Sequence, residues 1–404
     1  MKYQHPDRIL KAVPEYEFCT RINWKNYRAI VIESDDWGMG IPDYGLETVE
    51  DLEHLFRVLE EIKGSDGQPA VFTAFACMSN PDYEAIEASG FEKFIDTGPD
   101  KDSPVCKKWR EGIATGVFFP EYHSNLHHTS PVIWMELLRG NGPESERARD
   151  LFNKRRYSQG YHIPEFLGMN IKEINQWVKI GLERFYEAVG YKASVAVTSD
   201  AYPETEIIWS IHGIKAVSLK NSRNNYGEVV VYDTKPWNNQ NPWVPMGAYN
   251  RFYDLIYLVR NVSFECTSKD EGLTDEFILS VIEKRWENDE PAVIQSHRAH
   301  YVGVRRDSGL DRLARLLSLL AKKPNVRFLT SAEICCLYRQ GWSMRLHKKG
   351  YLLRKWTDDT QTLIMERPIK KITLLPNGDD FSDRIGKDGC SLHISQGDYL
   401  VEFT

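Results

Sequence analysis

The chain of 404 residues carries 51 Lys and Arg against 58 Asp and Glu, and 42% of its residues are hydrophobic. This length fits two or three domains, or one large barrel with an appended unit, and the apolar content is that of a folded chain. The formal net charge of −7 argues against non-specific binding to nucleic acid or to an anionic membrane, since both require a basic surface.

We expect neither a targeting segment nor a membrane-spanning segment. No apolar run approaches the roughly 20 residues needed to span a bilayer. Residues 1–18 carry charges throughout and show no apolar stretch followed by small residues, so we expect no secretory signal. The seven cysteines are odd in number and lack a Cys-x-x-Cys spacing, which argues against a disulfide framework or a thiolate zinc site. We therefore expect a cytoplasmic protein.

Short, nearly all-apolar runs alternate with helical patterns along the first 335 residues. Such runs are typical of strands buried on both faces of a parallel sheet. Apolar residues that recur every three or four positions predict amphipathic helices at 49–62, 171–189 and 313–320. The alternation predicts an α/β barrel or an open doubly wound sheet, and seven candidate strands lie close to the eight of a full barrel. These strands are 29–32, 70–75, 117–119, 194–197, 215–219, 292–294 and 326–329.

Two regions depart from this rhythm. Residues 221–261 are rich in Pro, Trp, Tyr and Asn, and so long an excursion predicts a functional loop. After residue 341, short apolar runs are separated by turn sequences, which predicts a small β-rich domain, most simply a sandwich. We expect a barrel domain at 1–340 and a β-rich accessory domain at 341–404. The predicted strands of the second domain are 362–365, 372–375, 391–394 and 399–403.

Two adjacent carboxylates, Asp35 and Asp36, follow the first predicted strand. In barrels and in open α/β sheets the active site lies beyond the carboxyl ends of the strands. One carboxylate there can bind a cation, while the other stays ionised and accepts a proton. The alternative is a solvated turn whose Asp caps a helix.

Histidines follow two other predicted strands. His123 and His127 come after the third strand, and on a helical turn their spacing of four puts both rings on one face, where they can share a metal. His128 would point elsewhere on a helix and is left out. His297 follows the sixth strand directly and can act as a general acid, because the pKa of histidine lies near physiological pH; the alternative is a structural histidine bonded to a loop.

Together, Asp36, His123 and His127 form a set of two imidazoles and one carboxylate with open positions for water. Such a set suits Zn²⁺, and also Fe²⁺, Co²⁺, Ni²⁺ or Mn²⁺. Competing signatures are missing from the sequence, which shows no Gly-x-Ser-x-Gly elbow, no Gly-rich phosphate loop and no Gly-x-Gly-x-x-Gly fingerprint.

The three segments together resemble the polysaccharide deacetylase family, carbohydrate esterases that include chitooligosaccharide and peptidoglycan deacetylases. The family's Asp-Asp pair matches Asp35-Asp36, its His-Ser/Thr-x-x-His motif matches residues 123–127, and its late histidine matches His297. The resemblance implies a distorted (β/α)7 barrel, Asp35 as catalytic base, His297 as general acid, and a metal held by the other three residues. It also implies removal of an acetyl group from an N- or O-acetylated carbohydrate.

One family feature is missing. Members carry an Arg-Pro motif after the middle strand, where the Arg orients the catalytic Asp, but residues 197–202 contain neither residue. Either another cation does that job, with Arg298 a candidate, or the catalytic base is tuned differently. The likeness is strongest to a poorly characterised branch whose last motif reads His-Arg followed by Tyr, as at 297–301, and the stretch 257–261 is also similar to that branch.

Aromatic residues near the motifs are candidates for contact with substrate. Trp37, together with Trp237 and Trp243, can stack on a sugar ring, and Tyr301 can line the mouth of the barrel; the alternative is that they pack in the core or in loops. Two other functions stay open: a non-catalytic glycan-binding or surface-polysaccharide assembly protein on a decayed deacetylase barrel, and a hydrolase of another non-peptide C–N bond.

Overall fold

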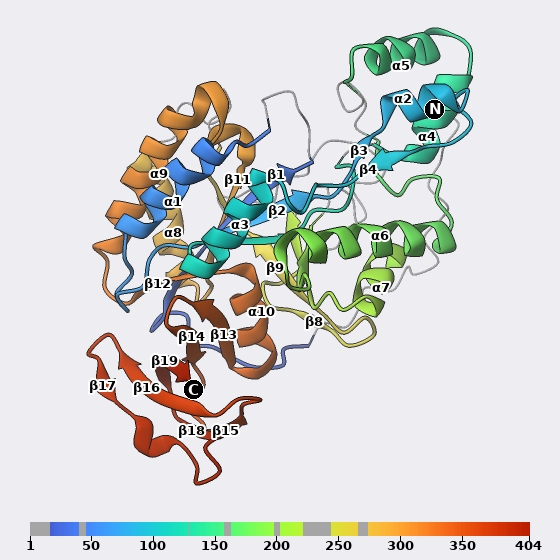
Figure 1. Ribbon diagram of the computed structural model, residues 1–404. Coiled ribbons are helices and arrows are strands. Elements are labelled where there is room, and N and C mark those ends of the chain that lie inside the picture. The colour runs from blue at the N-terminus through green and yellow to red at the C-terminus, as the bar shows by residue number, and fades with distance from the viewer. Residues whose placement is uncertain are drawn as a thin grey trace.

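The computed structural model describes residues 17–39, 46–127, 129–156, 163–197, 203–220, 244–265 and 274–404. Parallel strands occupy the middle of the molecule, helices lie around them, and antiparallel strands from the C-terminal part lie at one end (Figure 1). The predicted strands of the first 335 residues all form, and each begins within two residues of its expected first residue.

The parallel strands close into a distorted barrel. Strand β1 pairs with β11 on one side and with β2 on the other, and the path continues through β5, β6 and β7 to β9. The ring closes because β9 pairs with β7, while β10, separated from β9 by Asn261 alone, pairs with β11. The expected (β/α)7 barrel is therefore confirmed. The strands are β1 (Arg28–Gly38), β2 (Phe72–Cys77), β5 (Phe118–Tyr122), β6 (Val195–Ala196), β7 (Ala216–Lys220), β9 (Leu255–Arg260), β10 (Val262–Ser263) and β11 (Ala292–His297).

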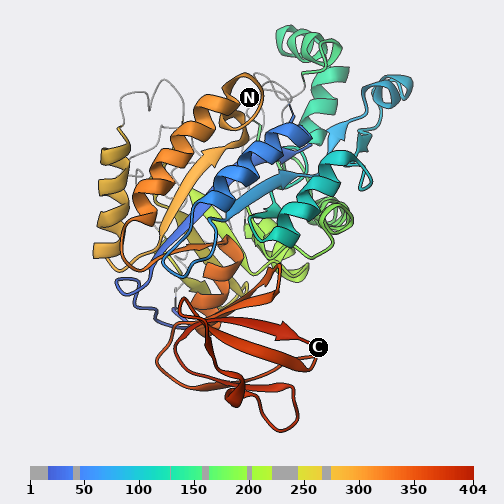
Figure 2. The same ribbon diagram turned by 60° about the vertical axis from the view of Figure 1, so that its left-hand side comes forward.

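Amphipathic helices cover the outside of the barrel, and Figure 2 shows α1 and α9 lying side by side along it. Helix α1 begins where the Thr48 hydroxyl and the Asp51 carboxylate cap each other's backbone N–H groups, and it buries Leu52, Leu55 and Leu59 against the strands. None of the described helices is long and apolar enough to cross a bilayer. The helices are α1 (Val49–Glu61), α3 (Pro104–Thr115), α6 (Ile171–Val189), α7 (Pro203–Ile211), α8 (Asp275–Glu287), α9 (Arg306–Ala321) and α10 (Ser331–Gln340).

Smaller elements fill the remaining connections. Strand β12 (Val326–Leu329) pairs with the first residues of β1, and β8 (Tyr249–Asn250) runs antiparallel to β9. Two excursions, one between β2 and α3 and one between β5 and α6, build a separate lobe at the upper right of Figure 1. Its elements are β3 (Asn80–Pro81), α2 (Tyr83–Ala88), β4 (Asp96–Thr97), α4 (Pro131–Arg139) and α5 (Pro143–Asn153).

The expectation of a loop across residues 221–261 is wrong for its last part. Strand β9 (Leu255–Arg260) lies there, and all six of its residues are buried. The strand was missed because Pro, Trp and Asn residues precede it. In addition, Tyr257 interrupts its apolar run and Arg260 ends it. Residues 221–243, which include Trp237 and Trp243, lie outside the described residues.

The C-terminal part forms two packed antiparallel sheets, as expected for a sandwich. One sheet has the order β13-β14-β19-β16-β17, and the other pairs β15 with β18. Leu353, Ile372, Leu392, Tyr399 and Val401 fill the core between them. The strands are β13 (Trp342–His347), β14 (Gly350–Lys355), β15 (Gln361–Ile364), β16 (Ile369–Leu375), β17 (Asp379–Asp380), β18 (Ser391–Ile394) and β19 (Gly397–Phe403).

Strands β13 and β14 were not predicted, because their charged residues point inward. Ser343 and Arg345 are buried while Met344 and Leu346 are exposed, which inverts the usual pattern. Buried Arg354 on β14 contacts Asp66 at 2.8 Å, Glu333 at 3.2 Å and Asp398 at 3.2 Å. This ionic cluster joins the barrel to the C-terminal sheets across residue 340, so the division of the chain at that point stays a prediction.

Replacing Arg354 with Met should lower the free energy of unfolding by about 3–5 kcal/mol, because carboxylates that the guanidinium neutralises would stay buried. Lys154→Met is the control, since Lys154 and Asp150 form an exposed pair worth roughly 0–1 kcal/mol. Urea unfolding of both variants measures the difference. Equal small changes in the two variants would show that the cluster does not stabilise the junction.

Burial raises the pKa of Glu121 on β5 to about 7 against an ordinary value of 4.5, although its carboxylate accepts hydrogen bonds from Ser194 and Val195. Between these values the folded chain binds a proton that the unfolded chain has lost, so this residue's contribution to stability falls as pH rises. The stability of Glu121→Gln relative to the parent should therefore increase from pH 4.5 to 7 and then level off. Urea midpoints across that range test the slope, and a constant difference would contradict it.

Candidate functional site

Asp35 and Asp36 lie at the carboxyl end of β1, where the strand is irregular. Successive side chains of a regular strand point to opposite faces. Here the register with β2 shifts between Ser34 and Trp37, and Asp36 adopts a left-handed backbone with φ of 71°. As a result both carboxylates face one histidine: His123 Nε2 lies 3.8 Å from Asp35 Oδ2 and 3.6 Å from Asp36 Oδ1.

His123 and His127 lie on the turn that follows β5. The expectation of a helical turn is wrong, because Ser124 and His127 have left-handed backbones with φ of 61° and 60°. The two rings nevertheless come together, with centroids 5.0 Å apart, and His127 Nε2 lies 2.9 Å from Asp36 Oδ1. His128 lies outside the described residues.

These three side chains have the properties of a metal-binding group. Two ring nitrogens lie close to the buried Oδ1 of Asp36: His127 Nε2 at 2.9 Å and His123 Nε2 at 3.6 Å. One carboxylate oxygen and two imidazole nitrogens therefore converge, as donor atoms around a cation do. Burial lowers the pKa of His123 to about 4, so its ring is neutral at pH 7 and keeps a lone pair for a metal. The residues present thus fit a divalent metal.

A guanidinium holds Asp35, and it comes from Arg260 at the end of β9. Its Nη1 and Nη2 each donate to one oxygen of Asp35 at 2.6 Å, and its Nε donates to Glu33 at 2.7 Å. Arg260 is 1% exposed. Burial alone would raise the pKa of Asp35, but this guanidinium holds it well below its ordinary range. Asp35 is therefore ionised and fixed in orientation.

The expectation that Arg298 reaches Asp35, or contacts a substrate, is wrong. Arg298 is 1% exposed and donates to Glu47 at 3.0 Å and to the carbonyl oxygen of Gly38 at 3.3 Å. Glu47 also accepts a hydrogen bond from the Gly38 N–H at 2.8 Å. The pair therefore fixes the end of β1 just after the two aspartates. The cation that binds Asp35 is Arg260. Its position at the end of an otherwise apolar run was the feature of the sequence that could have identified it.

His297 ends β11 directly opposite Asp35 in the strand register. Its Nε2 lies 4.0 Å from Asp35 Oδ2, and its Nδ1 lies 2.7 Å from Glu265 Oε1. The other oxygen of Glu265 lies 2.6 Å from His300 Nε2. Burial alone would raise the pKa of Glu265, but the imidazoles of His297 and His300 lower it to about 2, so the carboxylate is ionised and orients the His297 ring.

Glu265, His297 and His300 are also three donors close together, but they differ from the first group. Glu265 has one imidazole on each of its two oxygens, whereas both imidazoles of the first group approach the same oxygen, Asp36 Oδ1. We therefore interpret the second group as a hydrogen-bonded bridge. Sequence reasoning missed Glu265 and His300, because nothing in the local pattern distinguishes them from surface residues.

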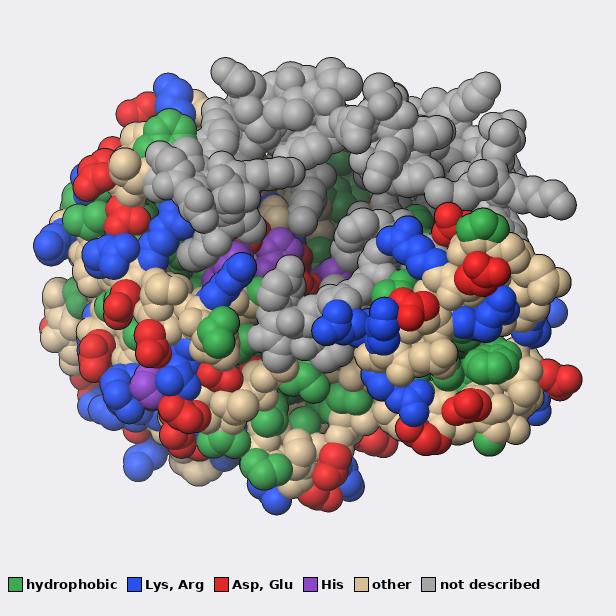
Figure 3. Space-filling model, turned by 90° about the horizontal axis from the view of Figure 1, so that it is seen from above, with side chains coloured by type: hydrophobic (Ala, Val, Ile, Leu, Met, Phe, Trp, Pro, Cys, Tyr) green, Lys and Arg blue, Asp and Glu red, His purple; other side chains and the backbone are tan. Residues whose placement is uncertain are grey.

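Seen from above, histidine side chains gather in a hollow near the middle of the molecule (Figure 3). The exposed fractions of the side chains are 26% for His297, 15% for Asp36 and 7% for His127. The candidate acid is thus the most accessible of these groups, and the residues expected to bind metal are more enclosed.

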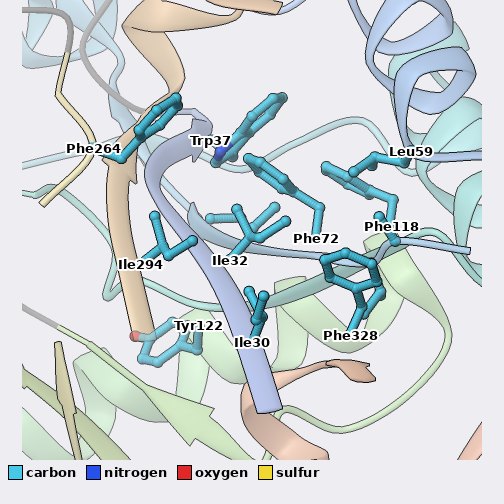
Figure 4. Close-up of a cluster of buried hydrophobic side chains, with 14 of the residues drawn as sticks. Ile30, Ile32, Trp37, Leu59, Phe72, Phe118, Tyr122, Phe264, Ile294 and Phe328 are labelled. Carbon is cyan, nitrogen blue, oxygen red and sulfur yellow. The ribbon is translucent and has the colours of Figure 1, made fainter. Parts of the chain in front are cut away.

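Trp37 and Tyr301 do not line this hollow. Both are 1% exposed or less, and each ring packs edge-to-face against Phe72 at centroid distances of 5.7 and 5.4 Å. Figure 4 shows Trp37 among Ile32, Phe72 and other core side chains. An enclosed ring has no face to offer a sugar, so the expectation that these two residues contact substrate is wrong.

No family model matches the chain, and no curated protein matches it. Among solved structures, it is similar to a candidate polysaccharide deacetylase of Mycobacterium smegmatis, with 10% identity over 80% of this chain and 95% of that one and a TM-score of 0.41. It is also similar to the CE4 domain of a xylanase from the hindgut metagenome of Trinervitermes trinervoides, with 9% identity over 76% and 89% of the two chains and a TM-score of 0.37.

A CE4 pseudoenzyme of Bacillus anthracis is similar as well, with 9% identity over 75% of this chain and 64% of that one and a TM-score of 0.34. Likenesses at this level carry no argument about activity, so the function is argued from the residues of this chain.

Asp36→Ala should abolish stoichiometric metal binding, because it removes the only carboxylate of the three donors. Asp150→Ala is the control, since Asp150 is exposed and lies on α5. Elemental analysis after loading with zinc and desalting measures metal per chain. One equivalent of zinc retained by Asp36→Ala would exclude this residue as a ligand.

Proposed function

We propose that this protein is a metal-dependent hydrolase that removes an acetyl group from an N- or O-acetylated carbohydrate. The observation that carries the proposal is the convergence of Asp36, His123 and His127, with Asp35 and His297 beside them. Buried Arg260 holds Asp35, and the carboxylate of Glu265, which is 12% exposed, holds His297.

In the proposed site, Asp36, His123 and His127 hold the divalent metal, Zn²⁺ in the first place, with Fe²⁺, Co²⁺, Ni²⁺ or Mn²⁺ also suited. A bound metal supplies Lewis acidity toward the acetyl carbonyl and the attacking water. This role requires a neutral imidazole at His123, which its low pKa provides.

Asp35 accepts a proton from the water as the water oxygen forms its bond to the carbonyl carbon. Arg260 keeps this carboxylate ionised and aimed, and its two short hydrogen bonds leave Asp35 little freedom to rotate. The site thus has its proton acceptor in place before substrate arrives.

His297 donates a proton from Nε2 to the leaving nitrogen or oxygen as the bond from the carbonyl carbon breaks. Acetate and a free amine or hydroxyl are the products. Glu265 accepts the hydrogen bond of Nδ1, which fixes the orientation of the ring.

The missing Arg-Pro motif favours the alternative of a decayed, non-catalytic barrel. Arg260 provides the cation from another strand, so the chemical requirement that the motif meets is satisfied. A glycan-binding protein would also have no need of a buried carboxylate oxygen on which two imidazoles converge.

The carbohydrate part of the proposal is supported by the resemblance of the three motifs to polysaccharide deacetylases. Hydrolysis of another non-peptide C–N bond, such as a cyclic or formyl amide, would use the same residues. We also propose a cytoplasmic location, which is supported by six described cysteines that are all free thiols.

Asp35→Asn should keep one metal per chain and lose roughly 100-fold or more in turnover, because an amide cannot accept the proton. Acetate release from N-acetylated chitooligosaccharides and O-acetylated xylooligosaccharides measures turnover, with a formyl amide and a cyclic amide in the same panel. Asp150→Asn serves as the control on α5.

Turnover of acetylated sugars by Asp35→Asn at the parental rate would exclude Asp35 as the base. Hydrolysis of an amide in the panel, without release of acetate from any sugar, would replace the proposed substrate class and keep the residue roles.

A further inference from the structure

The turn that carries His123 and His127 needs support from its surroundings. Ser124 and His127 both have left-handed backbones, which non-glycine residues adopt only when neighbouring structure compensates. In this conformation of the turn, Nε2 of His123 and Nε2 of His127 both approach Asp36 Oδ1. Whatever holds the backbone between the two histidines therefore also controls the geometry of the donors.

Glu165 lies directly under this backbone and is fully buried. Its Oε1 accepts hydrogen bonds from the N–H groups of Asn125 at 3.0 Å and Leu126 at 3.1 Å, and from the indole Nε1 of Trp177 at 2.6 Å. Those two N–H groups belong to residues between the histidines. Glu165 thus binds the turn backbone and is anchored in turn to helix α6.

Helix α6 makes a second contact with the same turn. Asn125 donates from Nδ2 to the Trp177 carbonyl oxygen at 2.8 Å, and its Oδ1 accepts from the Tyr122 hydroxyl at 2.9 Å. This approach is possible because residue 181 is glycine: a Cβ there would lie 1.8 Å from Asn125 Oδ1. The close packing of Gly181 therefore sets where the turn sits.

We propose that Glu165 is a positioning residue which, together with Gly181 on α6, holds the His123–His127 turn in the conformation that binds metal. The inference rests on the proposed metal site but not on the reaction or the substrate. Groups that fix the orientation of metal ligands typically change metal affinity roughly 10- to 100-fold when they are removed.

If Glu165 only stabilised the fold, its loss would lower stability without changing metal affinity. Glu121 is the residue with which this is compared. Glu121 is also buried and also accepts three hydrogen bonds from N–H and O–H groups, but these come from Ser194 and Val195, away from the turn. Loss of either carboxylate should lower stability. Only loss of Glu165 should loosen the metal.

The test compares Glu165→Ala with Glu121→Ala, and Gly181→Ala with Gly112→Ala. Gly112 is a helical glycine in α3, and a Cβ added there would lie 2.5 Å from Phe56. Gly112→Ala therefore also introduces a steric clash inside the protein, but away from the turn. Alanine favours the helix at both positions, so α6 and α3 should persist. Glu165→Gln is the rescue variant, because its amide oxygen can accept the same three hydrogen bonds.

Zinc affinity is measured by competition with a chelator, the geometry of the site by the visible absorption of Co²⁺, and stability by the melting temperature of the metal-free chain. Glu165→Ala and Gly181→Ala should raise the zinc Kd by roughly 10- to 100-fold and alter the Co²⁺ bands. Glu165→Gln should restore most of the affinity. Glu121→Ala and Gly112→Ala should lower the melting temperature and keep the parental Kd.

A parental zinc Kd in Gly181→Ala, or equal changes of Kd in Glu165→Ala and Glu121→Ala, would overturn the inference alone. If Glu165→Ala does not fold, Gly181→Ala decides the question. Failure of the parent chain to bind zinc or cobalt would overturn the proposed function, and the inference with it.

Discussion

The site depends on how the protein accommodates three carboxylates within four residues of one strand. Glu33, Asp35 and Asp36 all lie on β1, and Glu33 and Asp35 are buried. Arg260 bridges these two and supplies one positive charge against three acidic groups. Buried charges require partners, and a divalent cation at Asp36 would complete the balance. A bound metal would therefore neutralise the part of this negative charge that the guanidinium of Arg260 leaves.

Closure of the barrel and orientation of Asp35 depend on the same segment. Strands β9 and β10 complete the ring by pairing with β7 and β11, and β9 ends in Arg260. The side chain of Asn261 then bonds the backbone of Val293, which fixes the junction. A change that opened the ring there would also move the cation away from Asp35. Stability and chemistry are thus coupled in this part of the fold.

The candidate site combines strained backbone at some residues with hydrogen-bonded support from their neighbours. Asp36, Ser124 and His127 have left-handed backbones, and each lies next to a hydrogen-bonded support. Glu47 and Arg298 hold the chain after β1, and Glu165 holds the turn after β5. Local strain of this kind persists when the surrounding contacts outweigh it.

Local pattern in the sequence was sufficient for the barrel strands other than β9 and β10, for three amphipathic helices and for the five motif residues at strand ends, because periodicity reports how each segment is buried. Tertiary structure alone decided which partners those residues have. Arg260 lies 225 positions from Asp35, and Glu265 lies 32 positions from His297. It also decided that Trp37 is enclosed in the core. Contacts between distant segments have no local signature, so a buried ion pair and an enclosed ring become visible only once the chain is folded.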